Sequence, residues 1–166
     1  MRLFIAIRLS EIMKDALTEV QDKMRRTGVH GNYTARENLH LTLAFIGEFS
    51  DAEEVLDIID AIEFDPFRIR LNGIGSFGRL WWAGLEGGGE LETLCKRLRR
   101  ALSEAGIPYD RKKFSPHITL VRKPVSQTGA IPPGAWDSLR RAGMTVDHIS
   151  LMRSDRGKHG MIYTEL

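Results

Sequence analysis

Two short segments of the chain carry the same pattern, a histidine and a threonine two positions apart with an aliphatic residue after each. They are His40-Leu41-Thr42-Leu43 and His117-Ile118-Thr119-Leu120, and the second begins 77 positions after the first. In an extended strand, alternate side chains point to opposite faces, so each histidine shares a face with its threonine and the aliphatic residues point into a core. Two such strands indicate a site that combines two imidazoles with two hydroxyls.

This set of groups suits acid–base chemistry on a phosphate diester. In-line cleavage needs a base to activate the nucleophile and an acid to protonate the leaving oxygen, and imidazole serves both roles near neutral pH. Threonine hydroxyls are suitable donors to the charged phosphate oxygens. The sequence therefore predicts His40 and His117 as the acid–base pair and Thr42 and Thr119 as phosphate ligands. The alternative is that these are ordinary structural residues of two strands.

Arg122 is a candidate cationic donor, but its position on the strand argues against this role. It lies three residues after Thr119, so a regular pleat turns its side chain to the opposite face. Arg122 reaches a phosphate only if the strand ends or bulges before it, and Lys123-Pro124 makes an early end plausible.

No metal or other cofactor is implied by the residue spacing. The two motif histidines lack the local spacing of metal ligands, and the Gly87-Gly88-Gly89 run lacks the Lys-Ser/Thr ending of a phosphate-binding loop. Cys95 is the single cysteine and lies beside Leu94 in a helical pattern, so we interpret it as structural. A lone cysteine also fits a reducing compartment.

Hydrophobic periodicity and turn residues predict an alternation of strands and helices. Strands are predicted over 2–9, 39–46, 67–71, 80–85, 117–122, 144–152 and 161–166, the last in a hairpin through 157–160. Helices are predicted over 11–26, 52–62, 90–105 and 135–142, with a proline-containing loop over 124–133.

The order of these elements repeats at the spacing of the two motifs. We expect one domain of two similar lobes, with an approximate internal repeat that relates residues 2–77 to 79–154. An approximate two-fold axis between the lobes would bring the motif strands together, so that their His/Thr faces meet across a cleft.

The length and composition of the chain are those of an ordinary globular protein. The chain has 166 residues, of which 42% are hydrophobic and 28% charged, as in globular proteins. The net charge of +2 permits a nucleic-acid partner without demanding one. The apolar run at Met1–Ile7 is interpreted as a first strand rather than a signal peptide, and no stretch is long enough to span a bilayer. We expect a cytoplasmic protein with no membrane partner.

Three segments carry a resemblance to a known family. They are Arg2–Ile7, Asn38–Gly47 and Phe114–Arg122, with weaker marks at Ser154, Gly160 and Tyr163. Through them the chain resembles the 2H phosphoesterase superfamily, in particular the RNA 2′,3′-cyclic phosphodiesterases, also called 2′-5′ RNA ligases. The resemblance covers nearly the whole chain.

The resemblance implies a fold and a site. The fold is α+β and bilobal, with two pseudo-symmetric antiparallel sheets that line a central cleft and helices on the outside. The chemistry is metal-independent and uses no cofactor. His40 and His117 are implied to be catalytic, Thr42 and Thr119 to bind phosphate, and Arg122 to hold the substrate. The implied partner is an RNA with a 2′,3′-cyclic phosphate end, and we expect a monomer.

The resulting hypothesis is a hydrolase that opens RNA 2′,3′-cyclic phosphates and that, run backward, joins such an end to a 5′-hydroxyl. In the first assignment His117 activates water and His40 protonates the leaving ribose oxygen; the reverse assignment stays open. Two other functions also stay open: a non-catalytic RNA-binding module, and a phosphodiesterase of a small cyclic nucleotide derivative. Trp81 and Trp82 are expected in the core rather than in contact with a base, and Phe45 lies on the opposite strand parity from His40.

Overall fold

Two antiparallel sheets form the centre of the protein, as expected. The computed structural model describes residues 1–127, 131, 134 and 142–166. The first sheet has the strand order β3 (His40–Glu48), β1 (Arg2–Arg8), β8 (Ser150–Gly157), β9 (Gly160–Glu165). The second has the order β2 (His30–Tyr33), β6 (His117–Val125), β5 (Leu80–Gly87), β4 (Phe67–Phe77), β7 (Gly143–Val146). The α+β class with two antiparallel sheets is therefore confirmed.

Three α-helices and a short 3-10 helix complete the described part of the chain. They are α1 (Glu11–Arg26), α2 (Ala52–Asp60), α3 (Glu90–Glu104) and η1 (Arg36–Asn38). Helix α1 begins after Ser10, whose hydroxyl accepts a hydrogen bond from the Met13 amide at 3.2 Å, and α2 begins after Asp51, whose carboxylate accepts one from the Glu54 amide at 3.1 Å. Side-chain caps of this kind satisfy amide groups that have no partner within the helix.

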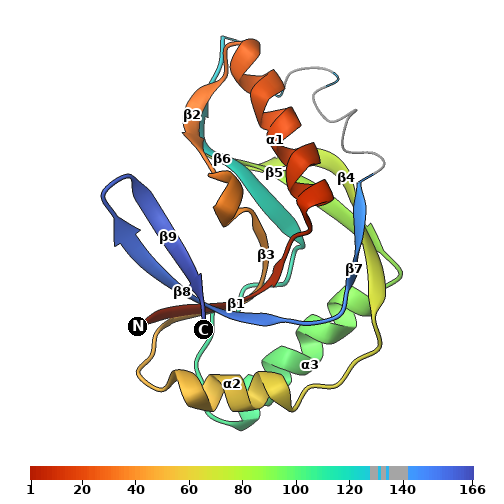
Figure 1. Ribbon diagram of the computed structural model, residues 1–166, viewed down its shortest axis with the longest axis vertical. Coiled ribbons are helices and arrows are strands. Elements are labelled where there is room, and N and C mark those ends of the chain that lie inside the picture. The colour runs from red at the N-terminus through yellow and green to blue at the C-terminus, as the bar shows by residue number, and fades with distance from the viewer. Residues whose placement is uncertain (128–130, 132–133, 135–141) are drawn as a thin grey trace.

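The helices pack in a crossed manner that ties the two halves of the chain together. Helix α1 follows β1 of the first sheet but packs against β6 and β7 of the second. Helix α3 follows β5 of the second sheet but packs against β3 of the first, with α2 beside it. Figure 1 shows α1 at one end of the molecule and α2 with α3 at the other. One cluster of buried residues runs through both sheets and all three α-helices, and we infer from this shared core that the chain is a single domain.

The two sheets share part of their strand order, but the halves of the sequence exchange strands. The neighbours β3-β1-β8 of the first sheet correspond to β6-β5-β4 of the second. Strands β2 and β4 come from the first half of the sequence but pair in the second sheet, and β8 begins in the second half but pairs in the first. Residues 2–77 and 79–154 therefore do not each form one sheet, because strands of each half pair in the sheet of the other.

Most predicted elements are confirmed within a few residues, and the differences have local causes. The strand predicted over 144–152 is two strands, because β7 pairs with β4 and β8 pairs with β1 in the other sheet. Strand β2 was not predicted, since its sequence His30-Gly31-Asn32-Tyr33 is polar and mostly exposed. The predicted 124–133 loop begins inside β6, and most of its remainder lies outside the described residues. The helix predicted over 135–142 also lies outside them, apart from its last residue.

No helix among the described residues combines the length and the apolar character that crossing a membrane requires.

Candidate active site

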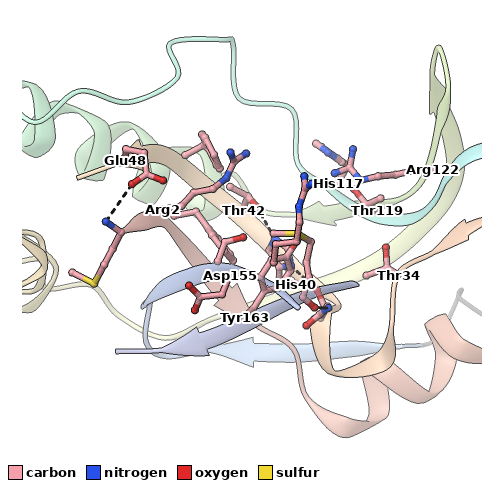
Figure 2. Close-up of a pocket in the computed structure, with 17 residues that line it drawn as sticks. Arg2, Thr34, His40, Thr42, Glu48, His117, Thr119, Arg122, Asp155 and Tyr163 are labelled. Atoms are coloured by element: carbon pink, nitrogen blue, oxygen red, sulfur yellow. Dashed lines mark hydrogen bonds and ion pairs between the residues drawn. The ribbon is translucent and has the colours of Figure 1, made fainter. Parts of the chain in front are cut away.

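The two motif strands meet at one cavity of about 600 Å³ between the sheets. His40 and Thr42 reach it from β3, and His117 and Thr119 reach it from β6. Figure 2 shows these four side chains near the middle of the cavity. Other residues that line it include Arg2, Phe4, Phe45, Arg122, Asp155 and Tyr163. The pairing of the motifs predicted from sequence is therefore present in the fold.

Each motif histidine is held by a backbone carbonyl two residues before it. The distance from Nδ1 of His40 to the Asn38 oxygen is 2.6 Å, and from Nδ1 of His117 to the Ser115 oxygen it is 2.7 Å. A carbonyl oxygen only accepts hydrogen bonds, so Nδ1 of each ring carries a proton and donates it. The other nitrogen, Nε2, is thereby left to accept or deliver protons in both rings.

Burial of His40 favours the neutral form of its ring. Burial lowers its pKa below the usual value, and the charges of His117 and Arg122 lower it further, while the hydrogen bond to the Asn38 carbonyl acts in the opposite direction. Its Nε2 lies 2.8 Å from the Thr42 hydroxyl oxygen. In neutral His40 this nitrogen has no proton, so the Thr42 hydroxyl donates to it.

A β-bulge brings Arg122 onto the cavity face. In the pairing of β6 with β5, Thr119 lies opposite Trp82 and Val121 opposite Trp81, so β6 contains one extra residue at this point. Leu120 and Val121 are consequently both buried, and the alternation of faces restarts one residue later. This is the condition under which the sequence allowed Arg122 to reach the site, and the side chain lines the cavity.

The same bulge occurs in β3. Thr42 pairs with Ala6 and Ala44 pairs with Ile5, so β3 also contains one extra residue at this point, and Phe45 turns to the cavity. Strand parity alone placed Phe45 on the face opposite His40, and the bulge is the physical reason for the difference. The Arg2 guanidinium lies 4.9 Å from the centre of the Phe45 ring, which places a cation at this end of the cavity.

Aromatic rings pack against both histidines. Phe4 of β1 and Tyr163 of β9 have ring centres 4.9 Å and 5.2 Å from that of His40. Phe77 of β4 has its ring centre 5.2 Å from that of His117. These ring contacts restrict the orientation of the imidazoles, and so position Nε2.

Trp82 is the second aromatic neighbour of His117, at 6.3 Å between ring centres. Sequence analysis placed both tryptophans in the core. This is confirmed for Trp81, which is 5% exposed, whereas Trp82 is half-buried on the side of β5 that faces the motif of β6. The indole lies over Gly75 of β4, where any Cβ atom would overlap its six-membered ring. Alternation along β5 could have separated the two tryptophans, since neighbouring strand residues face opposite sides.

Cys95 lies outside the cavity, as expected for a structural residue. It is buried, its Sγ donates to the Leu43 carbonyl at 3.3 Å, and burial raises its thiol pKa to about 11. Arg99 donates from Nε to the same carbonyl at 3.1 Å, so both side chains fasten α3 to the motif strand β3. Among the described residues, no three His, Cys, Asp or Glu side chains gather as metal ligands would.

Comparison with known proteins gives consistent matches. The model of the 2′-5′ RNA ligase superfamily matches residues 13–158. An RNA 2′,3′-cyclic phosphodiesterase of Aeropyrum pernix is 33% identical over 168 residues, which cover 93% of this chain and 94% of that protein. One of Thermus thermophilus is 35% identical over 182 residues, which cover 100% of this chain and 88% of that protein.

Solved structures agree with the sequence matches. A crystal structure of a Thermus thermophilus protein superposes with a TM-score of 0.83 at 34% identity, and the match covers 100% of this chain and 95% of that one. Escherichia coli LigT, crystallised with 3′-AMP, superposes with a TM-score of 0.78 at 28% identity, and the match covers 99% of this chain and 94% of that one.

Proposed function

Because the chain belongs to the 2′-5′ RNA ligase superfamily, we propose that it hydrolyses the 2′,3′-cyclic phosphate at the end of an RNA. The observation that carries the proposal is the shared cavity of His40 and His117, with Nδ1 of each ring bound to a carbonyl. Two imidazoles with Nε2 available on one cavity are the minimum set for acid–base attack on a phosphate.

In the proposed reaction, a water oxygen attacks phosphorus and forms a new P–O bond. The bond from phosphorus to one ribose oxygen breaks, one histidine takes the proton of the water, and the other gives a proton to the leaving oxygen. The products are a phosphate monoester and a ribose hydroxyl, so one water is consumed. With the 5′-hydroxyl of a second RNA as the nucleophile in place of water, the same site joins two RNA ends.

The roles of the two histidines follow from their protonation. In neutral His40 the lone pair of Nε2 can take the proton of the water once the Thr42 hydroxyl turns away from it. This supports His40 as the base that activates water and His117 as the acid, which is the reverse of the first assignment made from sequence. After the transfer, Nε2–H of His40 donates to the Thr42 oxygen, and the Thr42 hydroxyl is released to donate to a phosphate oxygen.

Thr119 and Arg122 complete the proposed phosphate site from the second sheet. Both line the same cavity as His117, and Arg122 forms no ion pair with any of the described residues. A guanidinium can donate two parallel hydrogen bonds to phosphate oxygens, and its charge stabilises the charge that builds up on them during attack. The monomeric state expected from sequence stays a prediction. The cytoplasmic location expected from sequence also stays a prediction.

The direct test is to incubate the protein with an oligonucleotide that ends in a 2′,3′-cyclic phosphate and to identify the product by chromatography and ³¹P NMR. Conversion to a phosphomonoester by the wild type, and none by the His40→Ala/His117→Ala double variant, would support the proposal. Binding of the oligonucleotide without conversion would instead identify a non-catalytic RNA-binding module. The position of the new phosphate, 2′ or 3′, shows which ribose oxygen leaves.

A further inference from the structure

A second cavity of about 1010 Å³ adjoins the first, between the β2–η1 segment and the β8–β9 hairpin. We call it the hairpin groove. Thr34, Asn38 and Arg122 line both cavities, as do Met161 and Tyr163 of β9. The Asn38 amide donates to the Met161 carbonyl at 2.8 Å, so η1 is tied to the hairpin where the two cavities meet. Figure 1 shows this hairpin extending away from the rest of its sheet.

The charged groups that line the hairpin groove are mainly cationic. Arg25 of α1, Arg122 of β6 and Lys158 of the hairpin turn contribute positive charges, and Glu37 is the one carboxylate among its described lining residues. Lys158 forms no ion pair with any described residue, and its neighbour His159 also lines the groove. These charges lie on three separate elements that line the hairpin groove, as expected for a surface that binds the phosphates of a nucleic-acid strand.

The groove also offers a planar surface. The Arg25 guanidinium lies 4.1 Å from the centre of the Tyr33 ring and pairs with Asp22 at 3.0 Å, so its orientation is constrained. Unpaired RNA bases stack on guanidinium planes and on aromatic rings. The combination of free cations and a stacked guanidinium fits single-stranded nucleic acid better than a small anion.

The opposite end of the first cavity has a different character. Glu48 and Asp155 lie there with Arg2, and the N-terminal ammonium pairs with Glu48 at 3.3 Å. The carboxylates offset the cations, so this end gives an RNA backbone less attraction than the hairpin groove does.

We propose that the nucleotides on the 5′ side of the cyclic phosphate lie in the hairpin groove, with their backbone phosphates near Arg25 and Lys158. The substrate is then an oligonucleotide rather than a free cyclic mononucleotide. This inference rests on the proposed function, because it places the cyclic phosphate between His40 and His117 and leads the rest of the chain past Arg122.

The test compares Lys158→Ala and Lys158→Glu with the wild type and with Lys96→Ala, a matched control on the exposed face of α3. One assay measures kcat/KM for a hexanucleotide that ends in a 2′,3′-cyclic phosphate and for 2′,3′-cyclic AMP. We expect the ratio of the two values to fall about threefold or more in Lys158→Ala, further in Lys158→Glu, and to stay at the wild-type value in Lys96→Ala.

A second assay measures binding of a fluorescent hexanucleotide 3′-phosphate as a function of salt, and does not depend on turnover. Loss of one phosphate contact reduces the slope of log K against log salt concentration by ~0.7 for a single strand. An unchanged slope and an unchanged substrate ratio in Lys158→Glu would overturn the inference. The Arg2→Ala variant removes a cation at the opposite end of the first cavity. A decrease in slope and substrate ratio in Arg2→Ala but not in the Lys158 variants would also overturn it. Failure of the proposed function would be visible separately, as the absence of hydrolysis of both substrates by the wild type.

Discussion

Phe45 and Arg122 occupy equivalent positions in the two motif strands, three residues after Thr42 and Thr119. Each reaches the cavity because a β-bulge follows the motif threonine. The two bulges make the sites symmetric in backbone but different in chemistry. The second strand presents a guanidinium, whereas the first presents a ring with the Arg2 guanidinium above it. On one side of the cavity the Arg122 guanidinium can contact a phosphate directly. On the other side the Arg2 guanidinium is stacked over the Phe45 ring.

Removal of either motif imidazole should abolish most activity without unfolding the protein. We expect His40→Ala and His117→Ala each to lower kcat for a 2′,3′-cyclic phosphate by about 10²-fold or more, because a positioned proton transfer contributes on the order of 10²–10⁴ in rate. The matched control is His148→Ala, since His148 is exposed and pairs only with Asp147 among the described residues. Circular dichroism would establish that the fold is retained. Wild-type turnover by either motif variant would refute the assignment.

The pH dependence of kcat/KM should report the neutral form of His40. Its pKa is lowered by burial and by the charges of His117 and Arg122, so activity is expected to rise with pH through a value below 6.5. NMR titration of the His40 ring measures the same pKa directly. In Arg122→Gln, the loss of one positive charge should move this pKa upward. A His40 pKa at or above 6.5 in the wild type would contradict its assignment as the base.

The same pKa shift predicts a loss of stability in acid. Below pH 6.5 the imidazole of His40 takes up a proton in the unfolded chain but not in the folded one, because the folded-state pKa is lower. The free energy of unfolding therefore falls as the pH decreases from 6.5 to the folded-state pKa. Urea unfolding of the wild type and of His40→Gln over this range should show a smaller decrease in the variant. If the free energy of unfolding fell equally with decreasing pH in both proteins, His40 would contribute nothing to the pH dependence of stability.

Arg122 should matter more for phosphate binding than any cation on the outer helix faces. Arg122→Gln is expected to lower kcat/KM about tenfold or more, because a neutral amide cannot replace charged, paired hydrogen bonds to phosphate oxygens. Arg100→Gln is the control, since Arg100 is exposed on α3 and pairs with Glu104 at 3.0 Å. Product inhibition by a nucleoside monophosphate should weaken in Arg122→Gln alone. Equal effects of the two substitutions would argue against a phosphate role for Arg122.

Gly75 should be needed for the position of His117, although it lies on a neighbouring strand. The Cβ atom of Gly75→Ala would overlap the Trp82 ring, and moving that ring disturbs its contact with His117. We expect a loss of about 1–3 kcal/mol in the free energy of unfolding and a decrease in kcat.

The matched control for this substitution is Gly88→Ala. There the nearest atoms are the flexible Glu90 carboxylate oxygens at 2.9 Å, which can move aside. Urea unfolding and steady-state kinetics of both variants measure the two effects. A stable, fully active Gly75→Ala protein would show that the indole does not position the imidazole.

The sequence was sufficient to name the four motif side chains that share the cavity and to predict their local faces. His40, Thr42, His117 and Thr119 could be named because strand alternation is a short-range property, visible in four consecutive residues. The helices with strong apolar periodicity, such as α1 and α3, were predicted within one residue of their observed ends for the same reason. The repeat of the motif at one spacing also indicated the two-fold arrangement of strands.

Only the tertiary structure decided what surrounds these groups. Whether Phe45 and Arg122 face the cavity depends on bulges, which arise from pairing with a neighbouring strand and have no signal in the strand itself. The lowered pKa of His40 depends on burial under Phe4 and Tyr163, which lie far apart in the sequence. The exchange of β4 and β8 between the sheets is likewise a long-range choice. Alternation and helical period are set by bonds between near neighbours, whereas register, burial and charge proximity are set by residues that meet only on folding.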